Sequence, residues 1–433
     1  MKKAIIYFSC ICLLAALFSI PVNGNDTLTV TDAEGFHSAL TAVSDRGTIN
    51  IKGTIALPAD FVWTSQNKAI TIAGGTLDFS KLTYVFLGNA VTFESITLKF
   101  APGSSLFANG HQLTVSKSVT VTGEPTLYGG AKYEAVDSTN VTLMAGTYTD
   151  IFGGGYFGGV NGDVNLQVGG RVNEDLKTIS HKHTYCVYGG GNNSKISGKV
   201  YLTVSGLARA NYVFGGALGL GSRIDGGIEI RFLGGEATGI CGGSRNVDQK
   251  CDVSLTMSGG TVEQIFGGCE HTSMTGDIEL NILGGTITRR IYGGCYNEVS
   301  ADGVWETGDY VTGDIYLTIS SSARINFTTG GADRAIYAHS RQKTLSDKET
   351  TYIRFADEAA YKKYIGKLGA QDSIMRSIMT GVSAADVILN VEDEVVDVPE
   401  TKPFPWLVLI VSIVIIAIPI TIVIIKKVRK TAP

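Results

Sequence analysis

The chain has no basic cluster between its two ends. The formal net charge of the whole sequence is −4, and it becomes −10 when the six basic residues of the two ends are set aside: Lys2, Lys3, Lys426, Lys427, Arg429 and Lys430. A nucleic-acid-binding domain ordinarily presents clustered Lys and Arg to the phosphates. We therefore expect no nucleic-acid partner.

Cysteine is scarce. Two of the seven cysteines fall within the N-terminal apolar run, and five remain: Cys186, Cys241, Cys251, Cys269 and Cys295. Five cysteines in a long chain do not form a disulfide framework, and an odd number leaves at least one thiol unpaired. Cys241 and Cys251 bracket a nine-residue turn and are the better candidates for a disulfide. We expect the other thiols to be free.

Long apolar runs mark the two ends of the chain. Residues 1–24 combine Lys2 and Lys3 with an apolar run and small residues, which is typical of a signal peptide. Residues 406–425 carry no formal charge and are long enough for one transmembrane helix. The basic tail 426–433 places the C-terminus in the cytoplasm by the positive-inside rule. Residues 392–405 are acidic and contain prolines, which favours an extended stalk.

These ends predict a single-pass protein of the cell membrane with its N-terminal domain outside the cell. The two lysines at the start of the signal peptide and the short basic tail favour a bacterial cell surface.

Glycine, in contrast, is abundant at 54 of 433 residues, above the roughly 7% of average usage. Gly-Gly follows an apolar–aromatic pair that returns along the chain, and after one long first interval its spacing is nearly constant. The pairs are Ile151-Phe152, Val187-Tyr188, Val213-Phe214, Ile240-Cys241, Ile265-Phe266 and Ile291-Tyr292. A motif that returns at a nearly constant interval indicates a repeated structural unit rather than one active site.

Short alternating segments accompany these motifs. Residues 163–168, 277–282 and 314–319 alternate polar and apolar side chains, which is the period of a half-buried strand. Nearer the N-terminus, a shorter and nearly equal spacing separates the apolar leads Ile49, Ile70, Val91 and Leu113. Such units are too short for propeller blades. Three short strands with glycine turns fit one rung of a parallel β-helix, with strands about 4.8 Å apart.

This pattern, together with residues 29–57 (TVTDAEGFHSALTAVSDRGTINIKGTIAL), resembles the right-handed parallel β-helix of the pectate-lyase-like superfamily. The later units resemble bacterial β-helical surface adhesins more loosely. We expect an all-β fold with the solenoid over residues 25–338, its first rung covered by a short helix between Glu34 and Val43. Helix formers between Asp357 and Leu368 favour a small α/β capping region over residues 339–391.

The aromatic column of the repeated motif leaves two arrangements open. If the aliphatic member of each pair points inward, its aromatic neighbour points outward, where a ladder of rings could bind sugar rings or a partner protein. The alternative is an internal aromatic stack, which Cys241, a small apolar member of the column, favours. The ligand-binding candidates are Phe152, Tyr188, Phe214, Phe266 and Tyr292, with Trp305 and Tyr310 from the insertion 299–311.

A column of aspartates is the best catalytic candidate. Asp163, Asp252, Asp277 and Asp314 each precede an alternating segment, but Lys199 and Gly227 interrupt the column. Stacked carboxylates repel unless a cation relieves them, so Asp252 and Asp277 are candidates for Ca²⁺. The favoured interpretation is that these aspartates accept hydrogen bonds from backbone amides at strand entries.

A zinc site is a weaker hypothesis. His181, His183 and Cys186 lie together at the insertion 171–185, and His-x-His on an extended segment suits Zn²⁺. Because no fourth ligand is evident, a solvated loop is the favoured interpretation. Apart from possible Ca²⁺, no cofactor is expected.

The favoured function is a membrane-anchored, non-catalytic adhesin or binding scaffold for a glycan or a cell-surface or matrix protein. The β-helix resemblance also implies a polysaccharide lyase or hydrolase. However, the short motifs of such hydrolases, Asn-Thr-Asp and Gly-His-Gly, are absent. A structural spacer of a surface layer is the third hypothesis. The sequence sets neither the ligand nor the oligomeric state.

Overall fold

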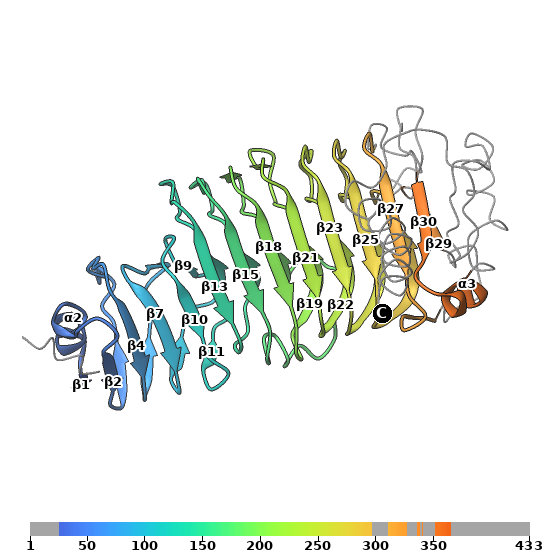
Figure 1. The fold of residues 1–433 in the computed structure, drawn as a ribbon. Helices are drawn as coiled ribbons and strands as arrows, with labels where there is room; N and C mark the ends of the chain where they lie inside the picture. Colours follow the sequence, from blue (N-terminus) through green and yellow to red (C-terminus); the bar gives the residue numbers. More distant parts are fainter. Residues whose placement is uncertain (1–25, 297–310, 327–335, 338–339, 341–350, 365–433) are drawn as a thin grey trace, which may run out of the picture. The chain divides into compact units, whose positions relative to one another are not determined.

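The computed structural model describes residues 26–296, 311–326, 336–337, 340 and 351–364. These residues form an all-β parallel solenoid of about 11 turns, consistent with the predicted right-handed parallel β-helix. In Figure 1 the strands of successive turns lie side by side in chain order. All of them belong to one compact unit, Met1–Val391.

The predicted signal peptide, stalk, membrane span and basic tail lie outside the described residues. Within the described residues, we find no helix with the length and apolar character that a membrane crossing needs.

One sheet of thirteen strands receives a strand from nearly every turn. In spatial order it consists of β1 (Thr27–Val30), β2 (Thr48–Ile51), β4 (Ala69–Ala73), β7 (Ala90–Glu94), β10 (Leu113–Val115), β13 (Thr139–Leu143), β15 (Val164–Val168), β18 (Val200–Val204), β21 (Ile228–Phe232), β23 (Val253–Met257), β25 (Ile278–Ile282), β27 (Ile315–Ile319) and β30 (Thr351–Phe355).

A second, eleven-strand sheet lies across the core from the first. It consists of β6 (Tyr84–Phe86), β9 (Ser105–Phe107), β12 (Thr126–Tyr128), β14 (Asp150–Phe152), β16 (Cys186–Tyr188), β19 (Arg209–Phe214), β22 (Glu236–Cys241), β24 (Thr261–Phe266), β26 (Thr286–Tyr292), β28 (Arg324–Ile325) and β29 (Ile336–Tyr337).

Two shorter sheets complete the described turns. The early turns contribute β3 (Thr54–Ala56), β5 (Thr76–Asp78), β8 (Thr97–Lys99) and β11 (Thr120–Thr122). The later turns contribute the pair β17 (Lys195–Ile196) and β20 (Arg223–Ile224).

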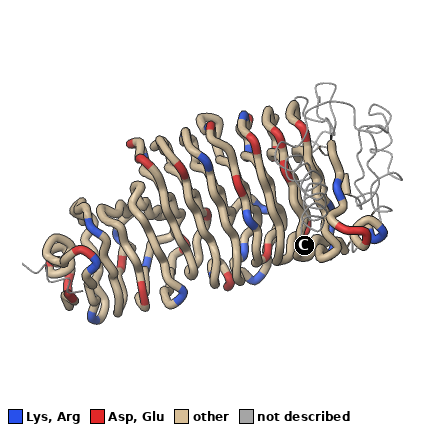
Figure 2. The backbone as a smooth tube through the Cα atoms, viewed as in Figure 1, with Lys and Arg blue, Asp and Glu red and all other residues tan. Residues whose placement is uncertain are grey.

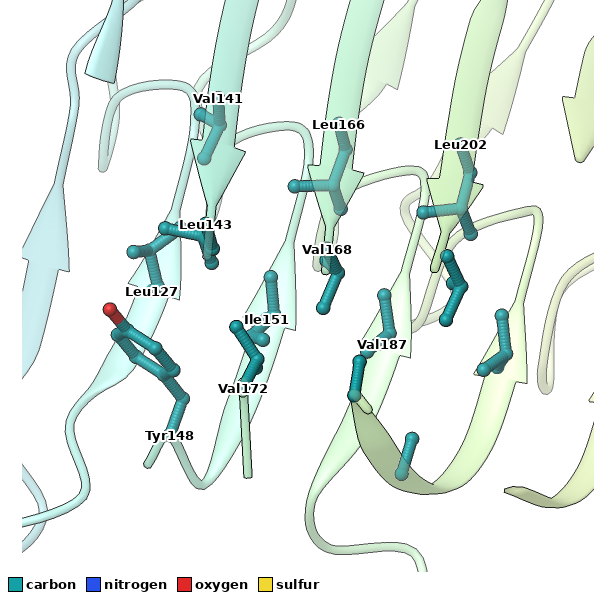
Figure 3. Close-up of a cluster of buried hydrophobic side chains, with 14 of the residues drawn as sticks. Leu127, Val141, Leu143, Tyr148, Ile151, Leu166, Val168, Val172, Val187 and Leu202 are labelled. Atoms are coloured by element: carbon teal, nitrogen blue, oxygen red, sulfur yellow. The ribbon is translucent and has the colours of Figure 1, made fainter. Parts of the chain in front are cut away.

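The core follows from the alternation in the sequence. In β15, Val164, Leu166 and Val168 are buried, whereas Asn165 and Gln167 are exposed. Figure 3 shows Val141, Leu166 and Leu202 on one side of the interior, with Leu127, Ile151 and Val187 on the other. Because β-strand side chains alternate between faces, each strand supplies one row of this continuous core.

The Gly-Gly motif allows the turns to stack closely. A Cβ atom placed on Gly242 would lie 2.0 Å from the carbonyl oxygen of Gly267 in the next turn, and one on Gly267 would lie 2.1 Å from that of Gly293. No larger residue fits without moving the backbone. The motif repeats because each of these later turns meets the next at the same close contact.

The first turn is covered by helix α2 (Ala33–Ala42), close to the predicted range. Asp32 begins the helix, its Oδ1 accepting a hydrogen bond of 2.8 Å from the Gly35 amide. Phe36 and Leu40 are fully buried in the solenoid core. At the other end, β30 pairs with β27, and helix α3 (Glu358–Tyr364) follows it.

Candidate binding surface

The aromatic column lies on the outer face of the eleven-strand sheet. Its members pair in register from Phe86 through Phe107, Tyr128, Phe152, Tyr188, Phe214, Cys241, Phe266 and Tyr292 to Tyr337. The rings stack nearly in parallel, with centroids 4.7 Å apart for Phe152 and Tyr188 and 4.9 Å for Tyr188 and Phe214. Their aliphatic neighbours belong to the interior core.

From Phe107 onward this column is a covered ladder, because chain on the outer face buries its rings. Tyr156 packs on Tyr128 at 5.6 Å between centroids, and Tyr296 packs on Phe266 at 4.3 Å. Neither predicted arrangement is therefore complete: the rings face outward, yet they form a second buried cluster separate from the solenoid core.

This burial corrects the predicted surface platform. Phe152, Tyr188, Phe214, Phe266 and Tyr292 are at most 3% exposed and offer no ring face to a ligand as they stand. The other two candidates, Trp305 and Tyr310, lie outside the described residues.

The column becomes accessible at its first strand, β6. Four rings, which we name the exposed ring patch, are more than one-third exposed: Tyr84 43%, Phe86 42%, Tyr133 65% and Phe157 49%. Phe86 stacks on Phe107 at 5.1 Å and so continues the ladder, and no further strand of this sheet lies beyond β6 in the described structure. Its outer ring face therefore lacks the next ring of the stack.

The other two rings of the patch come from loops. Tyr133 follows β12 and Phe157 follows β14, and their rings are parallel within 7° at 6.0 Å. Lys132 links the two halves of the patch. Its Nζ lies 3.4 Å from the Tyr84 ring centroid and 5.0 Å from that of Tyr133. These are cation–π distances.

The insertion 171–185 lies back on the solenoid instead of extending into solvent. We name its residues 174–185 the strap. Ser180 donates from its amide to Asn211 Oδ1 at 2.7 Å, and Asn211 Nδ2 donates to the Thr184 carbonyl at 2.6 Å. The Thr238 hydroxyl donates to the Ser180 carbonyl at 3.2 Å. The strap thus reaches β19 and β22, the next two turns.

The histidines of the strap face separate carboxylates. His181 Nε2 lies 3.3 Å from Glu263 Oε2, whereas His183 Nε2 lies 3.1 Å from Glu270 Oε2. The Cys186 thiol faces the Thr184 carbonyl at 3.8 Å. Among the described residues, no group of three or more His, Cys, Asp or Glu is arranged to hold a metal ion. The zinc hypothesis is therefore not supported.

A buried ion cluster lies beneath the strap. Glu270 is 1% exposed and accepts a hydrogen bond of 2.9 Å from Arg245 Nε, in addition to its contact with His183. Asp150 belongs to the same surroundings, and burial raises its pKa to about 6 against the opposing effects of the Cys186 amide, Arg245 and His183. Sequence spacing gives no sign of this cluster, because its members come from four different turns.

The aspartate column serves the backbone. The Oδ1 atoms of Asp163, Asp252 and Asp277 accept hydrogen bonds from the amides of Lys199, Asp277 and Asp314 in the next turn, at 2.8, 3.0 and 2.9 Å. The favoured interpretation of this column is confirmed at these positions. With one carboxylate oxygen bound to an amide in each turn, the column is not a cluster of free acids.

The five cysteines of the described region are buried and form no disulfide among the described residues. The predicted Cys241–Cys251 disulfide is wrong, because Cys241 lies in the outer aromatic cluster and Cys251 in the solenoid core. Cys269 and Cys295 occupy a tight corner, where the Cys269 amide donates to Cys295 Sγ at 3.2 Å. Small side chains there accept hydrogen bonds from the backbone of the preceding turn.

Charged residues of both signs are spread along the described backbone (Figure 2). No family model, curated protein or solved structure matches the chain. The interpretation of the site consequently rests on its own geometry.

Sequence reasoning missed the exposed ring patch. A signal was present in β6, because Tyr84 and Phe86 flank Val85 and therefore share the face opposite the core. Phe86 also precedes Phe107 by the length of one early repeat. Tyr133 and Phe157 lie in loops outside the repeats, and only the folded chain brings them beside β6.

Proposed function

We propose that the protein is a membrane-anchored, non-catalytic binding scaffold of the bacterial cell surface, and that the exposed ring patch binds a glycan. The patch is the observation that carries the proposal. It gathers Tyr84, Phe86, Tyr133 and Phe157, the only large aromatic side chains more than one-third exposed in the described structure.

Aromatic faces of this kind bind the apolar C–H face of a sugar ring, while phenol hydroxyls and an ammonium bond its hydroxyls. Tyr84, Tyr133 and Lys132 supply those polar groups at the edge of the patch. The repeated core supplies a rigid support, because β6 and β9 pair in register beneath the rings. The predicted span 406–425 would hold this surface at the membrane.

The test is binding of the full-length protein to a broad glycan array and to matrix proteins, with and without Ca²⁺. We expect saturable glycan binding that falls roughly tenfold or more in the Tyr133→Ala/Phe157→Ala variant, as for aromatic residues at the centre of an interface. Leu220→Ala is the matched control, because Leu220 is 88% exposed and lies outside the patch. Equal loss in both variants would overturn the assignment of the patch.

The polysaccharide lyase or hydrolase is the second candidate, and the ion cluster of Asp150, Arg245 and Glu270 favours it. Carboxylates beside an arginine can act in acid–base chemistry. Oligosaccharide released in the same wells, and lost in Glu270→Gln, would replace the scaffold proposal with this one. Binding without product supports the scaffold. Absence of both results favours the spacer.

A further inference from the structure

The turn that contains the strap is longer than the four turns that follow it. The interval between the motif at Ile151 and the motif at Val187 is clearly longer than each of the four intervals that follow it. The four turns that follow it close in the shorter length. The additional residues are therefore not needed to complete the rung.

The strap is held mainly by polar contacts, together with the stacking of the His183 ring on Tyr212. No residue from Glu174 to Tyr185 is buried in the structure. Its attachments include the hydrogen bonds of Ser180, Thr184 and Tyr185 with β19 and β22, and the contacts of His181 and His183. Arg209 also donates to the Leu176 carbonyl, and the Tyr185 hydroxyl donates to Glu124. A segment without buried apolar anchors opens at lower free-energy cost than the core beneath it.

The surface under the strap combines one flat ring with planar polar side chains. The Tyr212 ring lies over Gly239, where an added Cβ would meet it at 2.5 Å. Asn211, Thr238, Gln264 and Glu270 are nearly fully buried around it. Gln264 Nε2 donates to the Tyr212 hydroxyl at 3.4 Å. Buried donors and acceptors of this kind require partners.

Strap residues provide these hydrogen-bond partners, as a bound ligand would. The His183 ring stacks on Tyr212 at 5.1 Å and within 14°, and its Nε2 faces Glu270. Strap atoms also satisfy both ends of the Asn211 amide and the Thr238 hydroxyl. If the strap lifted, a ring and several paired donors and acceptors would be left open together.

We propose that the surface beneath the strap is a carbohydrate-binding site, which the strap covers and fills in this structure. The floor of the site consists of Tyr212, Asn211, Thr238, Gln264 and Glu270. A sugar ring takes the place of the His183 imidazole on Tyr212, and its hydroxyls, which both donate and accept, take the hydrogen bonds of the strap. Most floor partners are side-chain atoms rather than a strand edge, which favours a sugar over an extended peptide.

The site extends the proposed function without depending on the exposed ring patch. A ligand that competes with the strap should bind more tightly when the strap is removed. With the strap present, only the fraction of molecules whose strap is open can bind the ligand, and this lowers the apparent affinity.

The test removes residues 175–184, which brings the interval between Ile151 and Val187 to the length found in the later turns. We expect the folded variant, checked by its circular dichroism and melting curve, to bind a glycan of the array at least roughly tenfold more tightly than the full chain. Tyr212→Ala in the deletion background should abolish the gain. Tyr133→Ala/Phe157→Ala in that background should leave it intact, which separates this site from the patch.

His183→Ala is the second variant, in case the deletion impairs folding. It keeps the strap but removes the ring that covers Tyr212, so we expect a smaller gain that again requires Tyr212. Lys182→Ala, an exposed neighbour in the strap, is the control and should show no gain.

Unchanged glycan binding in both variants, or a gain that survives Tyr212→Ala, would overturn the proposal. A deletion variant that binds a synthetic peptide of residues 174–185 but no glycan would reject the carbohydrate assignment.

Discussion

The outward aromatic column begins in the turns before Gly129 and continues in the turns after it, but its first ring differs from the rest: Phe86 in β6 is 42% exposed, whereas the described rings of the column from Phe107 onward are buried. An early turn, such as that from Ile49 to Ile70, is shorter than a later one, such as that from Ile240 to Ile265. The additional residues form chain on the outer face, such as the loops of Tyr156 and Tyr296, which pack on the rings. The rings of β6, in the early turns, remain exposed.

The residue after each ring also changes along the column, between Phe107 and Tyr128. Leu87 and Ala108 follow Phe86 and Phe107, whereas glycine follows every ring from Tyr128 to Tyr292. The later turns bring carbonyl oxygens of successive Gly-Gly motifs to within 2.0–2.4 Å of where a Cβ would stand, as at Gly153, Gly215 and Gly242. The comparison shows how an outer face becomes a second core when loop length and small residues allow it.

The largest expected effect comes from truncating a ring of the covered ladder, and the same truncation at the exposed end of the column is the comparison. Phe214→Ala opens a cavity in the covered ladder, and we expect it to lower the free energy of unfolding by about 3–5 kcal/mol. Phe86→Ala, at the exposed end of the column, should cost about 1 kcal/mol, because its ring is already partly in water. Urea-denaturation midpoints measure both. Equal losses would contradict the distinction between the two regions.

Exchanging the residue after the ring should have the next largest effect. Gly242→Ala forces a Cβ against the Gly267 carbonyl oxygen, and we expect it to destabilise the fold by about 2–3 kcal/mol. The reverse change in the early turns, Ala108→Gly, should cost only about 0.5–1 kcal/mol through backbone entropy. Thermal melts of the two variants test this asymmetry. A harmless Gly242→Ala would mean that the turns can move apart.

The two regions should also differ in their response to pH. For Asp78 in the early turns, burial favours the neutral acid, but hydrogen bonds from Ser80 and Lys99 outweigh burial and lower its pKa. For Asp150 in the later turns, burial dominates and raises the pKa to about 6 from 3.8. The stabilising contribution of neutral Asp150 is complete below about pH 4 and lost by about pH 6.

We therefore expect Asp150→Asn to remove a fall of about 1–2 kcal/mol in the free energy of unfolding between pH 4 and pH 6. Urea titrations at several pH values measure it, with Asp163→Asn as the control on the thirteen-strand side. An unchanged pH profile in Asp150→Asn would show that Asp150 does not carry this dependence.

The smallest predicted change is a gain in stability. The hydroxyl of Tyr148 is buried in the solenoid core without a hydrogen-bond partner (Figure 3). Removing an unsatisfied buried polar group is favourable, so Tyr148→Phe should stabilise the protein by about 1 kcal/mol. Tyr133→Phe, on the exposed ring patch, should leave the melting temperature unchanged. A loss of stability in Tyr148→Phe would indicate that the hydroxyl has a partner, such as bound water.

The repeats were sufficient to predict the stacked parallel strands, because alternation and interval are local properties of the chain. The same holds for the helix predicted between Glu34 and Val43 and for the aspartates that accept backbone hydrogen bonds, since each residue acts on its own turn or the next. Cys241 and Cys251 show the limit of this reasoning. They are close in sequence, but Cys241 ends β22 in the outer aromatic cluster, whereas Cys251 precedes β23 and lies in the solenoid core.

The sequence by itself determined the solenoid, its interval and the alternation that sets the aromatic column opposite the aliphatic one. Only the tertiary structure decided which rings are covered, because the covering atoms come from other turns. The His183–Glu270 contact joins residues 87 positions apart, and the Lys132–Tyr84 contact joins a loop to a strand two turns earlier. Burial depends on what packs across turns, and no local pattern in the sequence encodes that packing.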